Sequence, residues 1–431
     1  MSLRGLRFAH LIDSDGPGGA ERMVASLAAE LQAAGAENVV IVPADGEGWL
    51  ARELSGTGVQ VELFRHDRRI SLGLVRRLVE TLRSHRVALA HSHEFNTAVY
   101  GALAARRAGI AHVVTMHGGR YYAAHLRRRV ALRIAVQLSG SIVAVSRSLA
   151  GALSRDLWMR RSRIVTIPNG VRLTLVAQSS LRSELRLGRG DQLAVAVGNL
   201  YAIKGHSYLL EALALLAARL PRLHVAIAGR GELEGPLLAR ARALQLGDRF
   251  HLLGLRPDIG NVLAGADVFV LPSLSEGVPL ALLEAMLAAR PIVASAVGEV
   301  PTVLGGGGAG VLVPQADAAA LASALADILT DPVHARRLGA AAAVRAAEEY
   351  TLARMVERYV ALYTRLLATA HRPDPLFQAR EIADAQTPMG GQGTQGGGEQ
   401  ATAGEGSVSI ETSRREARQV TEGLWVSGHD P

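Results

Sequence analysis

Short apolar runs alternate along the chain with longer stretches in which apolar residues recur at helical spacing. The runs hold valine, isoleucine, leucine and alanine in succession, which is typical of strands buried on both faces of a parallel sheet. A strand followed by a helix, repeated many times, predicts an α/β fold with helices covering both faces of each sheet. We expect strands at 6–12, 39–42, 59–64, 87–90, 112–116, 141–145 and 164–167, and a second series at 193–197, 224–228, 250–253, 268–271, 291–294 and 311–313.

A polar stretch near 174–190 separates the two series, and 431 residues exceed what one hydrophobic core usually holds. Two Rossmann-like domains that face one another form a cleft at the carboxyl ends of both sheets, where ligands bind. We divide the chain into an N-terminal domain at 1–180, a C-terminal domain at 181–349, an amphipathic crossover helix at 350–371 and a tail at 372–431. The Gly- and Gln-rich tail is predicted to be disordered.

The segment 275–284, Ser-Glu-Gly-Val-Pro-Leu-Ala-Leu-Leu-Glu, carries two carboxylates eight positions apart. It follows the predicted strand at 267–271 and enters a helix whose first turn suits Pro279, so Glu276 lies on the loop and Glu284 inside the helix. The first N–H groups of that helix favour an anion such as a diphosphate. The carboxylates diverge too far for a glycosidase pair and suit hydroxyl groups of two sugars instead. The predicted diphosphate contacts are Gly277, Val278, Pro279 and Leu280.

Lys204 is the only lysine of the chain, beside 46 arginines, and it follows the predicted strand at 193–197. A compact ammonium on a flexible stem is a good partner for a phosphate in a tight pocket, which a planar guanidinium does not mimic. The sequence therefore offers Lys204 as a second element of a nucleotide-sugar site.

These features and several others stand in the order found in a known family. The chain resembles the family 4 retaining glycosyltransferases of the GT-B fold over about residues 6–368. The matching pieces are Gly-Pro-Gly-Gly-Ala-Glu-Arg at 16–22, the strand end at 113–118, Val-Ser at 145–146, Ile-Pro-Asn-Gly-Val at 167–171, Lys-Gly at 204–205, 228–232, 254–256 and the two glutamates eight positions apart.

The resemblance implies a role for each matching residue. Glu276 would bind hydroxyls of the donor sugar, Glu284 the ribose and Lys204 the diphosphate. His117 matches the histidine near the reacting carbon. A Gly-rich turn that lets backbone approach the phosphates or the acceptor is matched by Gly18, Gly19 and Glu21.

Asn199 departs from the family, which usually has an arginine there as a second cation on the diphosphate. A charge-assisted contact of that kind is worth about 1.5–3 kcal/mol. Arg230, in the following βα loop, is a candidate to compensate. Arg256 lies in the matching piece at 254–256 and is expected to contact the donor.

The chain has no cysteine, which excludes disulfides and cysteine-based zinc sites and agrees with a reducing compartment. His91 and His93 share one face of a strand end beside Glu94, but the sequence offers no spaced third ligand. We interpret this pair as structural or acceptor-binding. The resemblance implies that no metal and no other cofactor is needed beyond the nucleotide-sugar co-substrate.

The net charge of +8 is unevenly placed, because residues 1–180 carry 24 arginines against 13 acidic residues. Arginines interleave with aromatic and apolar residues from 121 to 130, a composition typical of a helix lying on anionic lipid. With no apparent signal peptide and no apolar run of about 18 residues, we expect a cytoplasmic protein that docks on the inner face of the membrane. Aromatics are few and no recognition module is present, so we do not expect a nucleic-acid partner.

The sequence thus predicts transfer of a sugar from a UDP- or GDP-sugar to a hydroxyl of a glycan or lipid-linked glycan, in polysaccharide or glycolipid synthesis. Two alternatives stay open. A nucleotide-sugar epimerase of the same fold would need its own acid and base and no acceptor. A membrane-associated scaffold with a degenerate donor site would be consistent with Asn199.

Overall fold

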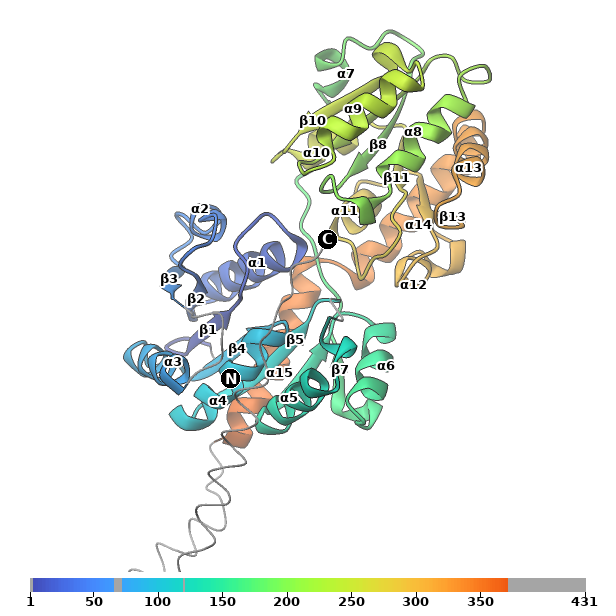
Figure 1. Cartoon of the computed structure of the whole chain (residues 1–431). Helices are drawn as coiled ribbons and strands as arrows, with labels where there is room; N and C mark the ends of the chain where they lie inside the picture. The colour runs from blue at the N-terminus through green and yellow to red at the C-terminus, as the bar shows by residue number, and fades with distance from the viewer. Residues whose placement is uncertain (1–2, 66–71, 119–120, 371–431) are drawn as a thin grey trace, which may run out of the picture.

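The computed structural model describes residues 3–65, 72–118 and 121–370, and within them the chain forms two parallel sheets, each in its own domain (Figure 1). The predicted tail at 372–431 lies outside the described residues. Every predicted apolar run overlaps an observed strand, which confirms the α/β class. In the N-terminal domain the strands are β1 (Arg7–Leu11), β2 (Glu37–Pro43), β3 (Gln60–Phe64), β4 (Leu89–His93), β5 (Ala111–Met116), β6 (Ser141–Ala144) and β7 (Ile164–Thr166).

The N-terminal sheet has the order β3-β2-β1-β4-β5-β6-β7 among the described strands. β4 extends beyond the predicted run at 87–90, because its last three residues are polar and nevertheless buried. The apolar pattern alone could not show this extension. The helices of this domain are α1 (Gly19–Ala33), α2 (Trp49–Glu53), α3 (Leu72–Ser84), α4 (Phe95–Ala108), α5 (Leu126–Leu138) and α6 (Arg147–Asp156).

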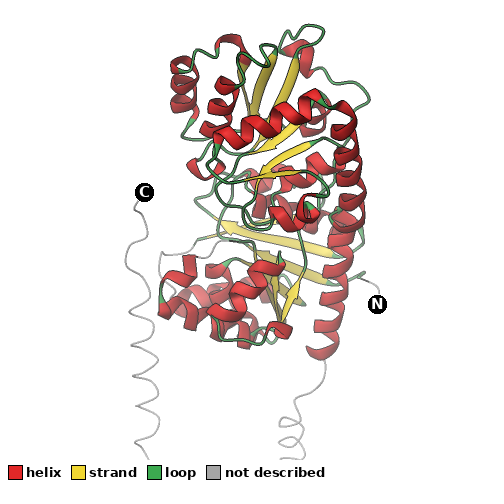
Figure 2. Cartoon of the chain, turned by 90° about the vertical axis from the view of Figure 1, so that its right-hand side faces the viewer, coloured by secondary structure: helices red, strands yellow, loops and turns green. Residues whose placement is uncertain are grey.

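The C-terminal sheet has the order β10-β9-β8-β11-β12-β13 in the described part of the chain. Its strands are β8 (Gln192–Val197), β9 (Leu223–Ala228), β10 (Phe250–Gly254), β11 (Val268–Leu271), β12 (Ile292–Ser295) and β13 (Val311–Val313). Its helices are α7 (Leu181–Glu184), α8 (His206–Leu215), α9 (Glu234–Ala243), α10 (Ile259–Ala264), α11 (Leu280–Leu287), α12 (Val300–Val303), α13 (Ala318–Thr330) and α14 (Pro332–Glu349). Helices cover both sheets, as Figure 2 shows.

The last helix, α15 (Leu352–Ala370), belongs by sequence to the end of the described chain but packs on the N-terminal domain (Figure 1). The Tyr363 hydroxyl lies 2.6 Å from His91 Nδ1, and its ring lies 5.1 Å from the ring of Phe8. Where the chain crosses back, Val171 and Thr351 form a single parallel bridge, so the two connections between the domains run side by side. Of the helices described, none combines the length and the apolar character needed to span a bilayer.

We expect Tyr363→Ala to lower the free energy of unfolding by about 3–5 kcal/mol, because it removes a fully buried aromatic ring from the seam between α15 and the N-terminal sheet. Urea denaturation followed by circular dichroism measures the loss. Arg365→Ala, on the exposed side of the same helix, should change the value by less than about 0.5 kcal/mol. Equal effects of the two substitutions would contradict this account.

Candidate active site

A cavity of about 350 Å³ opens between the two domains, where the carboxyl ends of both sheets face one another. The predicted residues that line it come from the Gly-rich turn, from the end of β5 and from loops of the C-terminal domain. They are Gly18, Gly19, His117, Asn199, Lys204, Arg256, Glu276, Gly277, Val278, Pro279, Leu280 and Glu284. The two parallel sheets bring these positions together from stretches that are far apart in the sequence.

Two of the predicted residues do not line this cavity. Arg230 instead pairs with Glu47 of the N-terminal domain, at 2.6 Å, and so closes a bridge between the domains. Glu21 is buried in the first turn of α1, behind the Gly-rich turn. Neither placement could be read from the sequence, because each depends on how the two domains meet.

Lys204 and Glu276 bind one another in this structure. The Lys204 ammonium donates to Glu276 Oε1 at 2.7 Å, and the Ser273 hydroxyl donates to the same oxygen at 2.7 Å. Lys204 lies on the short 3-10 turn after β8 and Glu276 on the loop after β11, two strands that are neighbours in the sheet. The ion pair therefore joins the predicted phosphate ligand to the predicted sugar ligand.

The helix that follows, α11, begins at Leu280 and contains Glu284, as predicted. Pro279 was expected in the first turn but precedes it as the N-cap residue. The first N–H groups of such a helix have no partner within it and favour an anion at the cavity wall. Gly277 brings the loop against the N-terminal domain, since a Cβ atom there would lie 3.2 Å from the His117 carbonyl oxygen.

Glu284 faces Arg22 across the domain interface. Burial raises the pKa of the Glu284 carboxyl to about 7, and the Arg22 charge opposes that rise. Both side chains also line an adjoining cavity of about 360 Å³. Sequence reasoning missed Arg22 as a site residue, although it ends the Gly-rich motif at 16–22.

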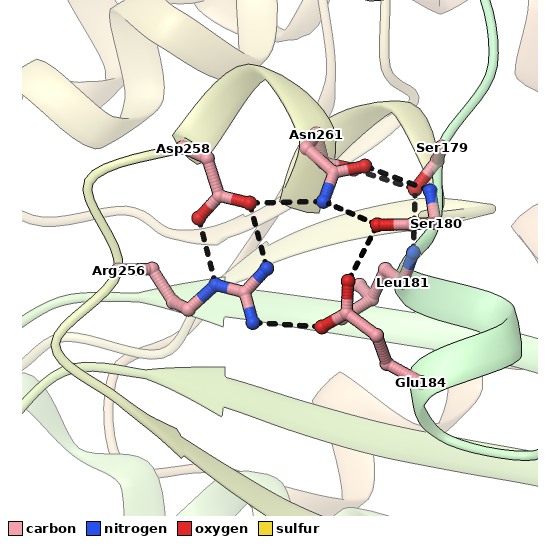
Figure 3. Close-up of polar contacts among 7 residues, drawn as sticks. All are labelled: Ser179, Ser180, Leu181, Glu184, Arg256, Asp258 and Asn261. Carbon is pink, nitrogen blue, oxygen red and sulfur yellow. Dashed lines mark hydrogen bonds and ion pairs between the residues drawn. The ribbon is translucent and has the colours of Figure 1, made fainter.

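Arg256 borders the cavity, but its guanidinium is occupied by two carboxylates, as Figure 3 shows. It donates to both oxygens of Asp258, at 2.7 and 2.6 Å, and to Glu184 at 2.8 Å. The paired guanidinium lowers the pKa of Asp258 to about 2. This side chain fastens α7 to the loop before α10, and its contact with the donor stays a prediction.

His117 follows β5 and is held at two points. Its Nε2 lies 3.1 Å from His93 Nδ1, and its backbone N–H donates to Glu94 Oε1 at 2.7 Å. Burial lowers the pKa of His117 to about 4 and raises that of Glu94 to about 8. Both groups are therefore neutral near pH 7.

Asn169 also lines the cavity and was not singled out, although it lies in the matching piece at 167–171. Its Nδ2 donates to the carbonyl oxygen of Val278 at 3.2 Å, across the domain interface. Its Oδ1 is buried and has no hydrogen-bond partner within the described residues. Asn169 therefore ties the loop at 277–279 to the N-terminal domain, and its second polar atom, Oδ1, makes no hydrogen bond within the described residues.

Comparison with known protein families gives two matches that together span most of the chain. The profile described as Glycosyltransferase Family 4 matches residues 17–175, and the profile described as Glycosyl transferases group 1 matches residues 178–345. The boundary between them falls in the segment that links the two sheets.

Two curated relatives are informative. The chain is 31% identical over 235 residues to the UDP-Gal:alpha-D-GlcNAc-diphosphoundecaprenol alpha-1,3-galactosyltransferase of Escherichia coli, which is 51% of this chain and 60% of that protein. It is 28% identical over 315 residues to the alpha-maltose-1-phosphate synthase of Mycolicibacterium smegmatis, which is 65% of this chain and 79% of that protein. The match thus spans less than two thirds of the first relative.

Among solved structures, Anabaena HepE in complex with UDP superposes with a TM-score of 0.73 at 23% identity, over 84% of this chain and 100% of that one. The same protein in complex with UDP-glucose gives a TM-score of 0.72 at 22% identity, over 84% of this chain and 100% of that one. These likenesses establish the two-domain GT-B fold.

The titration of Glu284 should be visible in the stability of the protein. Since its pKa rises from 4.5 to about 7 on folding, the folded chain retains a proton that the unfolded chain has released, so stability falls as the pH rises through this window. Glu284→Gln cannot ionise and avoids this loss. We expect it to gain about 1–3 kcal/mol over the wild type between about pH 4.5 and pH 8, measured by urea denaturation.

The exposed Glu348→Gln on α14 is the matched control, and its difference from the wild type should not change with pH over this range. A Glu284→Gln difference that is equally flat would contradict the assignment of a raised pKa to this carboxyl.

Proposed function

The chain belongs to the family 4 glycosyltransferases, group 1, which are retaining enzymes of the GT-B fold with nucleotide-sugar donors, and we propose that it transfers a sugar from a UDP-sugar to a hydroxyl of a lipid-linked glycan. Family membership places it among the transferases and argues against the epimerase alternative. The identity of the donor and of the acceptor is what we propose here, from the residues of the site and from the name of a relative.

One observation carries the donor site. Lys204, Glu276 and the first turn of α11 converge on one wall of the cavity, and Glu284 lies about one turn further along the same helix. A nucleoside diphosphate sugar has a diphosphate flanked by two polyhydroxyl groups, which fits a cation and helix N-terminus flanked by two carboxylates. A UDP-sugar is favoured because the Escherichia coli relative is named for UDP-Gal.

The site would promote departure of the nucleoside diphosphate. Negative charge grows on the diphosphate as the bond to the anomeric carbon breaks, and fixed donors aimed at that charge stabilise the transition state. As the diphosphate engages the Lys204 ammonium, Glu276 is released from its ion pair and its carboxylate accepts hydroxyl groups of the sugar. The acceptor hydroxyl would attack from the face on which the diphosphate departs, beside His117.

Arg22 is the candidate for the second cation that Asn199 does not provide. Of the cationic side chains that line the cavity, Arg256 is already paired with two carboxylates and Lys204 with one. No ion pair with a described residue holds the Arg22 guanidinium. This assignment replaces the expected compensation by Arg230.

The acceptor proposal rests on a surface of the N-terminal domain. Leu126, Val130, Ile134 and Leu138 recur every fourth residue on α5 and are all exposed, Leu126 by 64%. Arginines lie between them at 127–129 and 133. Trp158, which is 52% exposed, stacks with Arg129 at 4.3 Å. An exposed apolar stripe flanked by arginines and an indole suits the headgroup region of an anionic bilayer, where a lipid-linked acceptor is presented.

The donor site is tested by calorimetric binding of UDP, GDP and ADP. We expect one of them to bind the wild type, and Lys204→Ala to weaken it about tenfold to 150-fold, which corresponds to a lost charge-assisted contact. Arg230→Ala is the control, because it also removes a cation but lies outside the cavity, and it should change the affinity by less than about twofold.

Transfer assays complete this test, with Glu276→Ala and Lys204→Ala expected to abolish turnover while the circular dichroism of the folded protein is retained. Failure of all three nucleotides to bind would contradict the donor site and favour the scaffold alternative. Isomerised nucleotide sugar formed without acceptor would instead support an epimerase.

Membrane docking is tested by flotation with vesicles that contain anionic lipid. We expect the wild type to float at physiological salt and the double variant Leu126→Asp with Ile134→Asp to remain in solution. Leu215→Asp, which changes an equally exposed leucine on α8, should float like the wild type. A wild type that stays in solution would remove the membrane proposal and leave the donor site untouched.

A further inference from the structure

A row of buried polar side chains runs across neighbouring strands of the N-terminal sheet, from Asn38 to His117. His10 Nε2 lies 3.4 Å from Asn38 Oδ1, and His10 Nδ1 lies 3.4 Å from His93 Nε2. His93 Nδ1 then lies 3.1 Å from His117 Nε2. Asn38, His10 and His93 come from the adjacent strands β2, β1 and β4, so the parallel register of the sheet lines them up.

The three histidines of this row are neutral. Burial lowers the pKa of His10 and of His117 to about 4 each, and lowers that of His93 as well. A neutral imidazole has one ring N–H that donates and one ring nitrogen that accepts. The direction of one hydrogen bond in the row therefore fixes the direction of the others.

Asn38 sets that direction. Its Nδ2 donates to the carbonyl oxygen of Ala36 at 3.3 Å, so its Oδ1 is the atom that faces His10 and can only accept. His10 must then carry its proton on Nε2 and accept on Nδ1, and His93 must likewise donate from Nε2 and accept on Nδ1. His117 is left with its proton on Nε2 and a lone pair on Nδ1.

The atom at the end of the row is unpaired. His117 Nδ1 is buried and has no hydrogen-bond partner among the residues that the structure describes, and His117 lines the cavity between the domains. A buried polar atom without a partner is rare and calls for an explanation, of which a catalytic role is one. Here the atom is an acceptor, and the hydroxyl of a sugar or of an acceptor molecule is a matching donor.

A metal site is the competing interpretation, since ring nitrogens of His10, His91 and His93 lie within 4.8 Å of one another. Each of these nitrogens already has a protein partner in the described structure. His91 is bonded to the Tyr363 hydroxyl at 2.6 Å and to the Thr115 hydroxyl at 2.7 Å. A metal would have to displace these bonds, whereas the hydrogen bonds account for the cluster as it stands.

We propose that Asn38, His10 and His93 are positioning residues that hold His117 in the Nε2–H tautomer, so that Nδ1 accepts a hydrogen bond from a substrate hydroxyl. The identity of that hydroxyl rests on the proposed glycosyl transfer, whereas the tautomer does not. Glu94 also holds His117 in place, because its side-chain carboxyl accepts a hydrogen bond from the backbone N–H of His117. At metal sites, loss of a residue that orients a histidine ligand costs about tenfold to a hundredfold in affinity or activity, and we expect an effect of that order here.

The tautomer can be read directly by ¹H–¹⁵N correlation spectra of the chain labelled with ¹⁵N-histidine, without any substrate. The spin system that disappears in His117→Gln identifies this ring. We expect a neutral His117 with its proton on Nε2 near pH 7. A proton on Nδ1, an imidazolium, or a stoichiometric metal found in the purified protein by elemental analysis would each overturn the proposal.

Asn38→Leu removes the acceptor that sets the direction, at a site remote from the cavity. We expect a mixture of His117 tautomers and a fall in kcat of about tenfold to a hundredfold, with the KM for the nucleotide sugar changed by less than about twofold. An unchanged tautomer in the folded variant would contradict the proposal. If the variant does not fold, the wild-type spectrum still decides.

The matched control is His112→Leu. His112 is buried in the same sheet, and within the described residues its ring hydrogen-bonds to the hydroxyls of Ser92 and Ser139, at 2.9 and 2.7 Å. Its replacement should leave the His117 tautomer unchanged. A protein that transfers no sugar yet shows the expected tautomer would refute the proposed function and leave the positioning row intact, so the two failures are distinguishable.

Discussion

The cleft depends on the return of the chain to its first domain. α15 packs its tyrosines onto β4 and β5 of the N-terminal sheet, and the two connections between the domains lie side by side where Val171 bridges Thr351. They approach so closely at Gly170 that a Cβ atom there would lie 2.3 Å from the Thr351 carbonyl oxygen. The packing of α15 and these paired connections fix how the two sheets are oriented toward one another, and the contacts across the cavity depend on that orientation.

Most cationic side chains in and around the cleft are paired with carboxylates, so few of them remain available to a ligand. Arg256 and Arg230 are bound to carboxylates and hold structural elements together. Lys204 is also paired, but with Glu276, which is itself a predicted ligand, so one incoming nucleotide sugar can engage both partners at once. An ion pair of this kind keeps two desolvated charges compatible with folding until a substrate replaces each with a new partner.

Sequence pattern and structure agree closely on the strands and on the loop that carries Glu276, because a parallel sheet needs continuous apolar runs and a helix start has its own local signals. At Arg256 the motif lines the cavity, as expected, but the ion pairs of its guanidinium with Asp258 and Glu184 could not be read from the sequence. His10 was overlooked for a similar reason. It lies far from His91 in sequence and becomes its neighbour only through the register of β1 and β4.

The sequence by itself determined the class of fold, the order of the strands along the chain, the loop and helix positions of Glu276 and Glu284, and the singular place of Lys204. Each of these is encoded within a few consecutive residues. Only the tertiary structure decided which side chains remain available to a ligand: that Arg22 and Asn169 line the cavity, that Arg230 and Glu21 do not, and that Asn38 orients His117 through two histidines. Those outcomes depend on strand register and domain packing, which join residues that no local pattern connects.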